Sequence, residues 1–138
     1  MIDQDSELGA RAARRLRDEV VIWMTTVTPD GSPLPRPVWF IWDGAESAVI
    51  YSRPSPRVRN LETNPRVTLH FDGDGGGGDI IVFSGTAAVD PELPPADQSP
   101  QYLEKYDEHI ARIGMTPESF AGAYSVPVRI RFTRVDGH

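Results

Sequence analysis

A serine–proline pair in the first half of the chain predicts a helix start that could bind an anion. Ser55 suits the N-cap position and Pro56 the first helical position, so a helix should begin here and end near Asn64, ahead of Pro65. The first turn of a helix carries free backbone N–H groups and the positive end of the helix dipole. Such a turn is a suitable site for a phosphate or a carboxylate.

Three arginines surround this helix start. Arg53 precedes the cap, Arg57 lies in the first turn and Arg59 lies just beyond it, in a chain of net charge −6. A cation at a helix N-terminus opposes the dipole, so the cluster needs a reason, and a phosphate held by guanidinium groups would supply one. The residues alone leave a second interpretation open, in which the cluster is solvated and paired with Glu62 or Asp43.

Other residue types that could do chemistry give weaker signals. Trp39, Phe40 and Trp42 could flank a flat heteroaromatic ring, or they could belong to the core. The three histidines have no metal-ligand spacing and no paired carboxylate motif accompanies them, so we expect no metal site. The glycine run at 75–78 lacks the lysine of a phosphate-binding loop and is predicted to be the tip of a hairpin.

Hydrophobic periodicity and turn residues predict the elements that must position these side chains. Strands are expected at 20–27, 35–42, 48–52, 66–71, 79–89 and 126–135. Besides the helix that begins at Ser55, helices are expected at 7–19, 101–113 and 117–123. The helix at 7–19 should be capped by Ser6 or Asp5 and should keep Arg11, Arg14 and Arg17 mostly in solvent. Six strands with hairpin-length connections favour a small antiparallel barrel with flanking helices over a βαβ fold.

Composition restricts the class of protein. The 138 residues fit a single domain, 1–138, and 39% of them are hydrophobic, which argues against disorder. With 20 acidic and 14 basic residues, the chain lacks the positive charge that nucleic-acid binding requires. It has no cysteine, no apolar signal core and no apolar run long enough for a membrane span, so we expect a cytoplasmic protein.

Three segments in order resemble a known family. They are VVIWMTTVTPDGSPLPRPVWFIWDG, VIYSRPSPRVRNLETNPRVTLHFDGD and VPVRIRFTRVDGH. Together they are similar to the pyridoxamine phosphate oxidase-like split barrels, and within these to the actinobacterial flavin/deazaflavin oxidoreductases described as F420-dependent. The similarity spans nearly the whole chain. It implies a mainly β fold with flanking helices, a six-stranded antiparallel FMN-binding split barrel, and a homodimer with the cofactor at its interface.

The resemblance also implies a set of cofactor-binding residues. Ser52 and Arg57 match the family's phosphate-contacting hydroxyl and basic positions. Pro37, Val38 and Trp39 match the family's strand that flanks the cofactor ring, and Tyr51 matches the residue beside it. Arg53 and Arg59 have no counterpart in the family and are included because of their charge. The full expected set is Pro37, Val38, Trp39, Tyr51, Ser52, Arg53, Arg57 and Arg59.

One departure from the family bears on the cofactor. Enzymes that oxidise pyridoxamine phosphate carry a basic residue about five positions after an arginine in the ring strand; Arg36 is present here, but Ile41 and Trp42 follow it. We therefore expect coenzyme F420 rather than FMN, and a reductase that moves a hydride from reduced F420 to a small unsaturated or quinone-like substrate. The alternatives are an FMN-dependent oxidoreductase and a protein that binds a deazaflavin or a tetrapyrrole without turnover. The proton would come from water or from Tyr51.

The tryptophans support the expected homodimer in a different way. Trp23, Trp39 and Trp42 offer more aromatic surface than one small core needs. A surface of this kind would be covered by a second copy of the chain.

Overall fold

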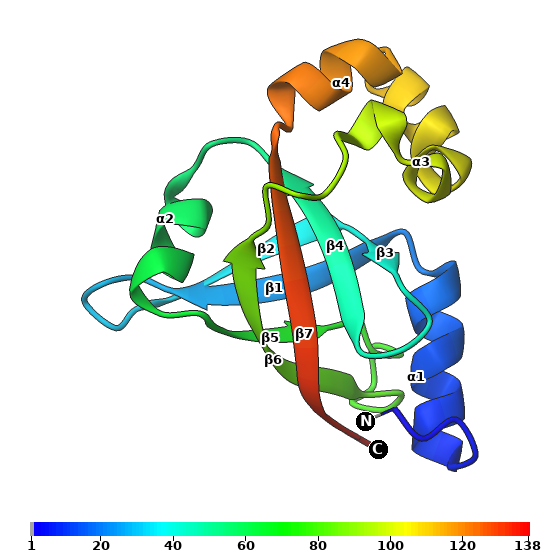
Figure 1. The fold of residues 1–138 in the computed structure, drawn as a ribbon. Helices are drawn as coiled ribbons and strands as arrows, with labels where there is room; N and C mark the ends of the chain where they lie inside the picture. Colours follow the sequence, from blue (N-terminus) through cyan, green and yellow to red (C-terminus); the bar gives the residue numbers. More distant parts are fainter. Residues whose placement is uncertain (1) are drawn as a thin grey trace.

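The computed structural model describes residues 2–138 and shows a curled antiparallel sheet with helices around it (Figure 1). The strands are β1 (Val21–Val27), β2 (Pro33–Trp39), β3 (Ile41–Trp42), β4 (Ser47–Ser52), β5 (Arg66–His70), β6 (Ile81–Val89) and β7 (Val126–Gly137). The helices are α1 (Glu7–Asp18), α2 (Pro56–Thr63), α3 (Pro100–Arg112) and α4 (Pro117–Ala123), with a short 3₁₀ turn, η1 (Ala96–Gln98), before α3. Each predicted helix is present, and so is each predicted strand except 35–42, which is divided in two; the ends of the others differ from the prediction by at most two residues.

The strand order explains why the sheet curls. It runs β2-β1-β5-β6-β7-β4-β3, and all neighbouring pairs are antiparallel. The two edge strands, β2 and β3, are separated in the chain by Phe40 alone. Edges joined by one residue must lie close together, so the sheet rolls into the split barrel that the sequence predicts.

The prediction of six strands is wrong, because the expected strand 35–42 is interrupted. The backbone of Phe40 does not continue the ladder: its N–H donates to the Tyr106 hydroxyl at 2.8 Å, and its carbonyl accepts from that hydroxyl and from Lys105 Nζ at 2.9 and 3.0 Å. Two side chains of α3 thus replace the strand partner. The result is two strands, β2 and β3, and seven in the sheet.

Helix α1 follows the prediction at its start and departs from it along one face. Ser6 is the N-cap and its side chain accepts from the Gly9 N–H at 2.9 Å. Arg14 and Arg17 are exposed, as expected. Arg11 is not simply solvated, because its guanidinium pairs with Asp79 at 2.9 Å and fastens the helix to the end of the β5–β6 hairpin.

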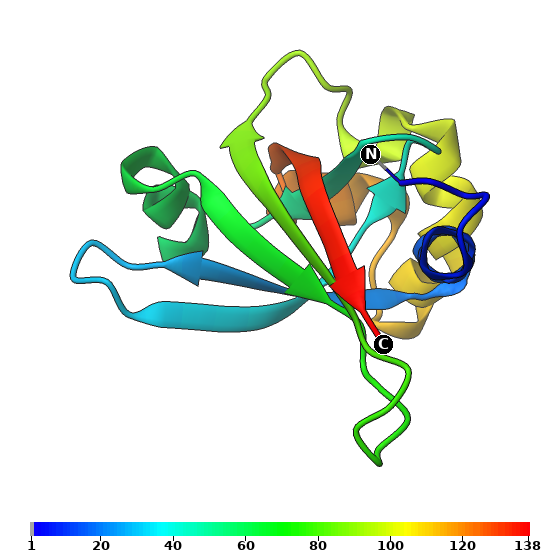
Figure 2. The same cartoon turned by 90° about the horizontal axis from the view of Figure 1, so that it is seen from below.

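That hairpin ends in the glycine-rich segment, which projects from the body of the molecule (Figure 2). One carboxylate oxygen of Asp74 accepts from the N–H groups of Gly76 and Gly78. Gly75 and Gly77 have φ values of 86° and 89°, which glycine adopts without steric cost. The segment is a hairpin tip, as predicted.

Two hydrophobic cores divide the interior. The first lies inside the curled sheet and is closed by α1; its fully buried members include Leu16, Ile22, Met24, Phe40, Leu69, Phe83, Ile130 and Phe132. The second lies between the sheet and the α3–α4 pair and is mostly aromatic, with Tyr51, Tyr102, Tyr106 and Phe120. The second core positions the site described below.

The three tryptophans differ in their burial. Trp42 is only 6% exposed, and its Nε1 donates to the Ala45 carbonyl. Trp23 is partly buried and stacks on His70, with ring centroids 6.4 Å apart. Trp39 is likewise only partly buried, so two of the three tryptophans keep some exposed surface, and the homodimer stays a prediction. No helix within residues 2–138 is long and apolar enough to cross a bilayer.

Candidate functional site

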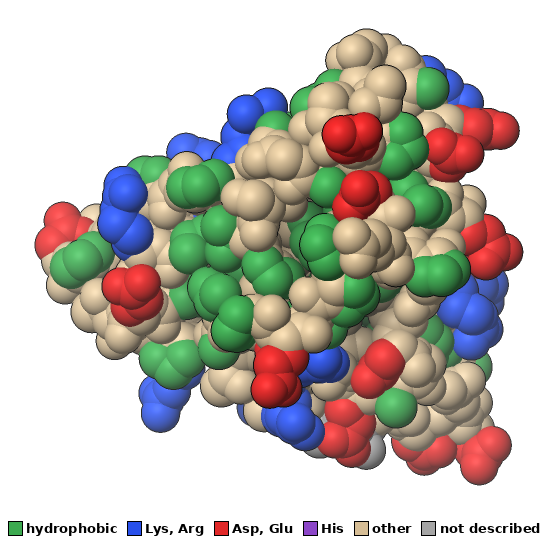
Figure 3. All heavy atoms as spheres, turned by 45° about the horizontal axis from the view of Figure 1, so that its top comes forward, with side chains coloured by type: hydrophobic (Ala, Val, Ile, Leu, Met, Phe, Trp, Pro, Cys, Tyr) green, Lys and Arg blue, Asp and Glu red, His purple; other side chains and the backbone are tan. Residues whose placement is uncertain are grey.

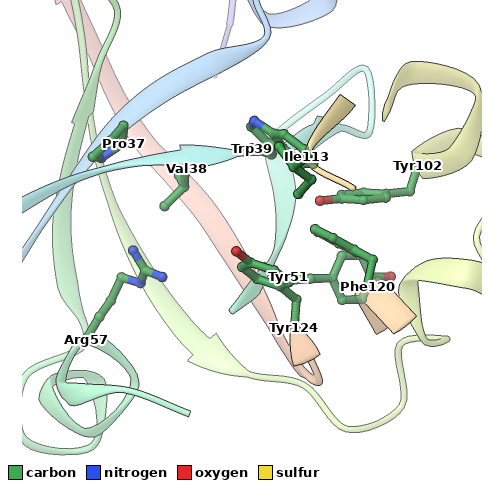
Figure 4. A pocket seen from close by; sticks show the side chains of 9 residues that line it. All are labelled: Pro37, Val38, Trp39, Tyr51, Arg57, Tyr102, Ile113, Phe120 and Tyr124. Carbon is green, nitrogen blue, oxygen red and sulfur yellow. The ribbon is translucent and has the colours of Figure 1, made fainter. Parts of the chain in front are cut away.

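A cavity of about 260 Å³ lies between the sheet, the start of α2 and the α3–α4 pair (Figure 4). One end carries the charge of Arg57, and the rest is mostly aromatic or aliphatic. The lining residues are Pro37, Val38, Trp39, Tyr51, Arg57, Tyr102, Ile113, Phe120 and Tyr124. Strands β2 and β4 supply the first four, α2 supplies the arginine, and the α3–α4 segment supplies the others.

Arg57 is a partly buried cation without a carboxylate partner. Its Nη2 donates to the Oγ of Ser52 at 3.0 Å, and that fully buried hydroxyl in turn donates to the Arg53 carbonyl at 2.8 Å. Burial, and then the nearby charge of Arg36, lower the pKa of Arg57. Across residues 2–138 no acidic side chain forms an ion pair with Arg57. Its charge is thus held away from water without local neutralisation.

The alternative of a cluster paired with Glu62 or Asp43 is wrong. The carboxylate of Asp43 accepts instead from the N–H groups of Ala45 and Ser47 in its own turn. Within the described chain, none of the ion pairs involves Glu62. The arginine cluster therefore has a net positive charge, which suits an anion.

Ser55 occupies the N-cap position of α2, but it does not cap the helix as predicted. Its backbone is extended, with φ −157°, and its Oγ is buried without a hydrogen-bond partner. The N–H groups of Val58 and Arg59 both donate to the Ser55 carbonyl, so the first turn offers fewer free amides than the sequence suggested. The unused groups are side-chain atoms: Ser55 Oγ and Arg57 Nε are both buried and unpartnered.

The structure brings most of the predicted site residues together. Pro37, Val38, Trp39 and Tyr51 line the cavity with Arg57. Trp39 serves both interpretations, since it lines the cavity and also belongs to the second core, where its ring stacks 4.8 Å from Tyr106 and 5.5 Å from Phe120.

Three predicted residues lie outside the lining. Ser52 stands behind Arg57 as its hydrogen-bond partner. The guanidinium of Arg53 lies over the Tyr124 ring, 4.6 Å from its centroid, and so reaches the rim of the cavity through that ring. Arg59 is exposed on α2 and does not line the cavity.

Four lining residues come from the α3–α4 segment and were not predicted: Tyr102, Ile113, Phe120 and Tyr124. The spacing of four between Tyr102 and Tyr106, and between Phe120 and Tyr124, indicates buried helix faces in the sequence. That spacing does not tell which buried ring borders a cavity, because a core ring and a cavity wall show the same pattern.

The arrangement suits a flat ligand with an anionic end. Apolar and aromatic walls can hold a ring, and the guanidinium at one end can hold a phosphate or carboxylate. Burial raises the pKa values of Tyr51 and Tyr102, so these hydroxyls stay protonated at neutral pH. Tyr51, considered from the sequence as a proton source, donates its hydroxyl to the Pro94 carbonyl at 2.7 Å. Among residues 2–138 there is no cluster of three or more metal-ligating side chains.

A split barrel with such a cavity beside a helix start defines a class of small-molecule-binding proteins. The family described as pyridoxamine 5'-phosphate oxidase matches residues 8–137 of the sequence, and the chain belongs to this family. No curated protein sequence matches the chain.

Solved structures share the fold over most of their length. An F420 reductase has a TM-score of 0.64 and 22% identity, covering 89% of this chain and 94% of the other. An FAD-binding protein from Mesorhizobium loti has a TM-score of 0.66 and 21% identity, covering 91% and 90%. The heme storage protein HutZ from Vibrio cholerae has a TM-score of 0.61 and 16% identity, covering 96% and 95%. At these identities the similarity establishes the fold, which serves different ligands in different proteins.

Proposed function

We propose that this protein is a flavin-type oxidoreductase that uses coenzyme F420 and reduces a small unsaturated or quinone-like substrate. One observation carries the proposal: a partly buried arginine with no carboxylate partner lies at one end of an aromatic-walled cavity, in the first turn of a helix whose N-cap serine has a buried hydroxyl without a partner. Buried polar groups without partners are uncommon and cost free energy, so an anion that binds both groups would relieve that cost.

The residues present fit an anionic, ring-bearing cofactor. Arg57 and Ser55 would hold its phosphate, and Ser52 keeps the guanidinium in place through the 3.0 Å hydrogen bond. Val38 and Trp39 would flank the ring system from β2. A reduced deazaflavin supplies a hydride when bound; the protein supplies position, orientation and exclusion of water.

The surrounding charge favours F420 over FMN. Arg53 lies at the rim of the cavity, and Arg59 is exposed on α2, the helix that carries Arg57. Arg36 is close enough to lower the pKa of Arg57. A long anionic tail can use several such cations, whereas FMN needs one phosphate site. Exposed contacts of this kind contribute about 0.5–1 kcal/mol each and are screened by salt.

The proposal includes a homodimer. The cavity of about 260 Å³ in one chain is smaller than the roughly 300–1,000 Å³ typical of ligand sites, so a cofactor of this size needs more surface than one copy provides. Hydrophobic side chains gather near the middle of the face that carries β6 and β7 (Figure 3), and Val89 at the end of β6 is 41% exposed. A second copy could cover this face. Light scattering at micromolar concentration should give twice the 15.3 kDa monomer mass, and a monomer alone would contradict it.

Parallel titrations with F420 and FMN test the cofactor. F420 should bind more tightly at low salt, and the difference should shrink as salt is added. Equal affinities at low salt, or stoichiometric FMN in protein from its native host, would assign FMN instead. Turnover with reduced F420 and a panel of enones and quinones then tests the activity, and tight binding without turnover would indicate a carrier or storage protein.

A further inference from the structure

Tyr102 presents a hydroxyl to the cavity that nothing in the protein uses. The residue belongs to α3, is completely buried and lines the cavity. Its hydroxyl points into the cavity from the side opposite Arg57 (Figure 4) and has no hydrogen-bond partner. A buried hydroxyl without a partner costs on the order of one hydrogen bond, which the fold alone does not recover.

The two other buried tyrosines of the same aromatic core use their hydroxyls within the protein. Tyr51 donates to the Pro94 carbonyl at 2.7 Å, and Tyr106 bonds to the backbone of Phe40 and Val20. A tyrosine hydroxyl that is buried in this core can therefore find a hydrogen-bond partner within the protein. Tyr102 is the exception, and its hydroxyl is the one that faces the cavity.

The surroundings of the hydroxyl define what it can bind. Tyr51 packs edge-on against the Tyr102 ring at 4.9 Å, and Phe120 packs at 5.9 Å. Burial raises the pKa of Tyr102, so the group is a neutral donor rather than an anion. Aromatic neighbours disfavour a charged ligand at this end and favour a flat, uncharged one. The matching chemical group is a neutral oxygen acceptor on a conjugated ring.

We propose that Tyr102 is a specificity-determining residue that donates a hydrogen bond to a carbonyl oxygen of the substrate. The protein would then select small, flat, conjugated carbonyl compounds over hydrocarbons of the same shape. This assignment rests on the proposed function, because it assumes that the cavity holds a substrate. The hydrogen bond itself joins only the protein and the substrate. It can therefore be tested without the cofactor.

Equilibrium dialysis of the cofactor-free protein with two probes gives the test. Menadione carries ring carbonyls, and 2-methylnaphthalene has nearly the same shape without them. Wild type should bind menadione more tightly than 2-methylnaphthalene. Tyr102→Phe, which removes only the oxygen, should weaken menadione about tenfold and leave 2-methylnaphthalene unchanged. Arg66→Ala, an exposed arginine on β5 that does not line the cavity, is the control and should leave the binding of both probes unchanged.

Two outcomes would overturn the assignment, and a third would overturn only the proposed cofactor. Equal menadione affinity in wild type and Tyr102→Phe, or no preference for menadione in wild type, would show that the hydroxyl recognises no carbonyl. A tenfold loss of F420 affinity in Tyr102→Phe, with menadione unaffected, would assign the hydroxyl to the cofactor. If wild type fails to bind F420 while the menadione pattern holds, the proposed cofactor is wrong and the role of Tyr102 stands.

Discussion

Two regions next to α3 differ in whether their buried polar groups have hydrogen-bond partners. At the strand break, defined here as Phe40 with Tyr106 and Lys105, the backbone N–H and carbonyl that leave the sheet are both bonded. In the cavity lining, two buried polar atoms have no partner, Arg57 Nε and Tyr102 Oη, and Ser55 Oγ at the N-cap of α2 has none either. Tyr102 and Tyr106 lie one helical turn apart, yet one holds the fold together and the other is unused.

The difference separates a structural region from a binding region. A fold that closes a gap in its own sheet with side chains has no need to leave nearby polar atoms buried and unbonded. An unpartnered atom alone is weak evidence, since Arg11 Nε and His109 Nδ1 are also buried without partners outside the cavity lining. The guanidinium of Arg11 is at least paired through another nitrogen. What marks the cavity is that an unpaired charge, Arg57, and an unpartnered hydroxyl, Tyr102, line one space.

The largest expected effect is on ligand binding at the charged end of the cavity. Arg57→Ala should weaken F420 binding by about 1.5–3 kcal/mol, or roughly ten- to a hundredfold, because a charge-assisted contact is lost. The ligand-free protein should be no less stable, since a partly buried cation beside another arginine is removed. Titration and melting curves check both. Arg66→Ala, an exposed arginine on β5, is the control and should change neither.

Substitutions at the strand break should lower the stability of the protein rather than its affinity for a ligand. Tyr106→Phe leaves the buried Phe40 N–H without its acceptor and should lower the free energy of unfolding by about 1–3 kcal/mol. Tyr102→Phe removes a buried oxygen that bonds to nothing, so it should leave the free energy of unfolding unchanged or raise it by about 1 kcal/mol. Urea unfolding of both variants measures the contrast. Equal losses would remove the distinction between the two regions.

A smaller effect compares two serines at helix starts. Ser6 caps α1 through the Gly9 N–H, so Ser6→Ala should cost about 1 kcal/mol of stability. Ser55 makes no cap bond, so Ser55→Ala should cost clearly less and should instead weaken F420 binding a few-fold. A stability loss as large as that of Ser6→Ala would mean that Ser55 caps α2 in solution.

The last effect is a pH dependence at the strand break. Burial lowers the pKa of Lys105 from 10.5 to about 8. Between these values the unfolded chain binds the proton and the folded chain does not, so the free energy of unfolding should rise with pH from about 8 toward 10.5. Below pH 8 both states are protonated and this contribution is constant. The stability difference between wild type and Lys105→Met, in which other titrations cancel, should show the rise; a difference independent of pH from 7 to 10 would contradict it.

The sequence by itself determined the order of the elements and the place of the arginine at one end of the cavity. Turn residues and hydrophobic alternation located each helix and strand because these signals act between near neighbours in the chain. The serine–proline pair and the arginines around it identified the start of α2 for the same reason. Pro37, Val38, Trp39 and Tyr51 were identified from the family resemblance, and they do line the cavity.

Only the tertiary structure decided which polar groups have partners. Phe40 leaves the sheet because Tyr106 and Lys105, more than sixty positions away, reach its backbone, and no local pattern encodes such a contact. Ser55 has the sequence of a cap, but the backbone around it directs its hydroxyl elsewhere. Tyr102 and Tyr106 have similar positions in the sequence, on the same face of α3. In the fold the Tyr106 hydroxyl is bonded to the backbone of Phe40, whereas the Tyr102 hydroxyl has no partner. Hydrogen-bond satisfaction depends on distances between distant segments, which the chain fixes only when it folds.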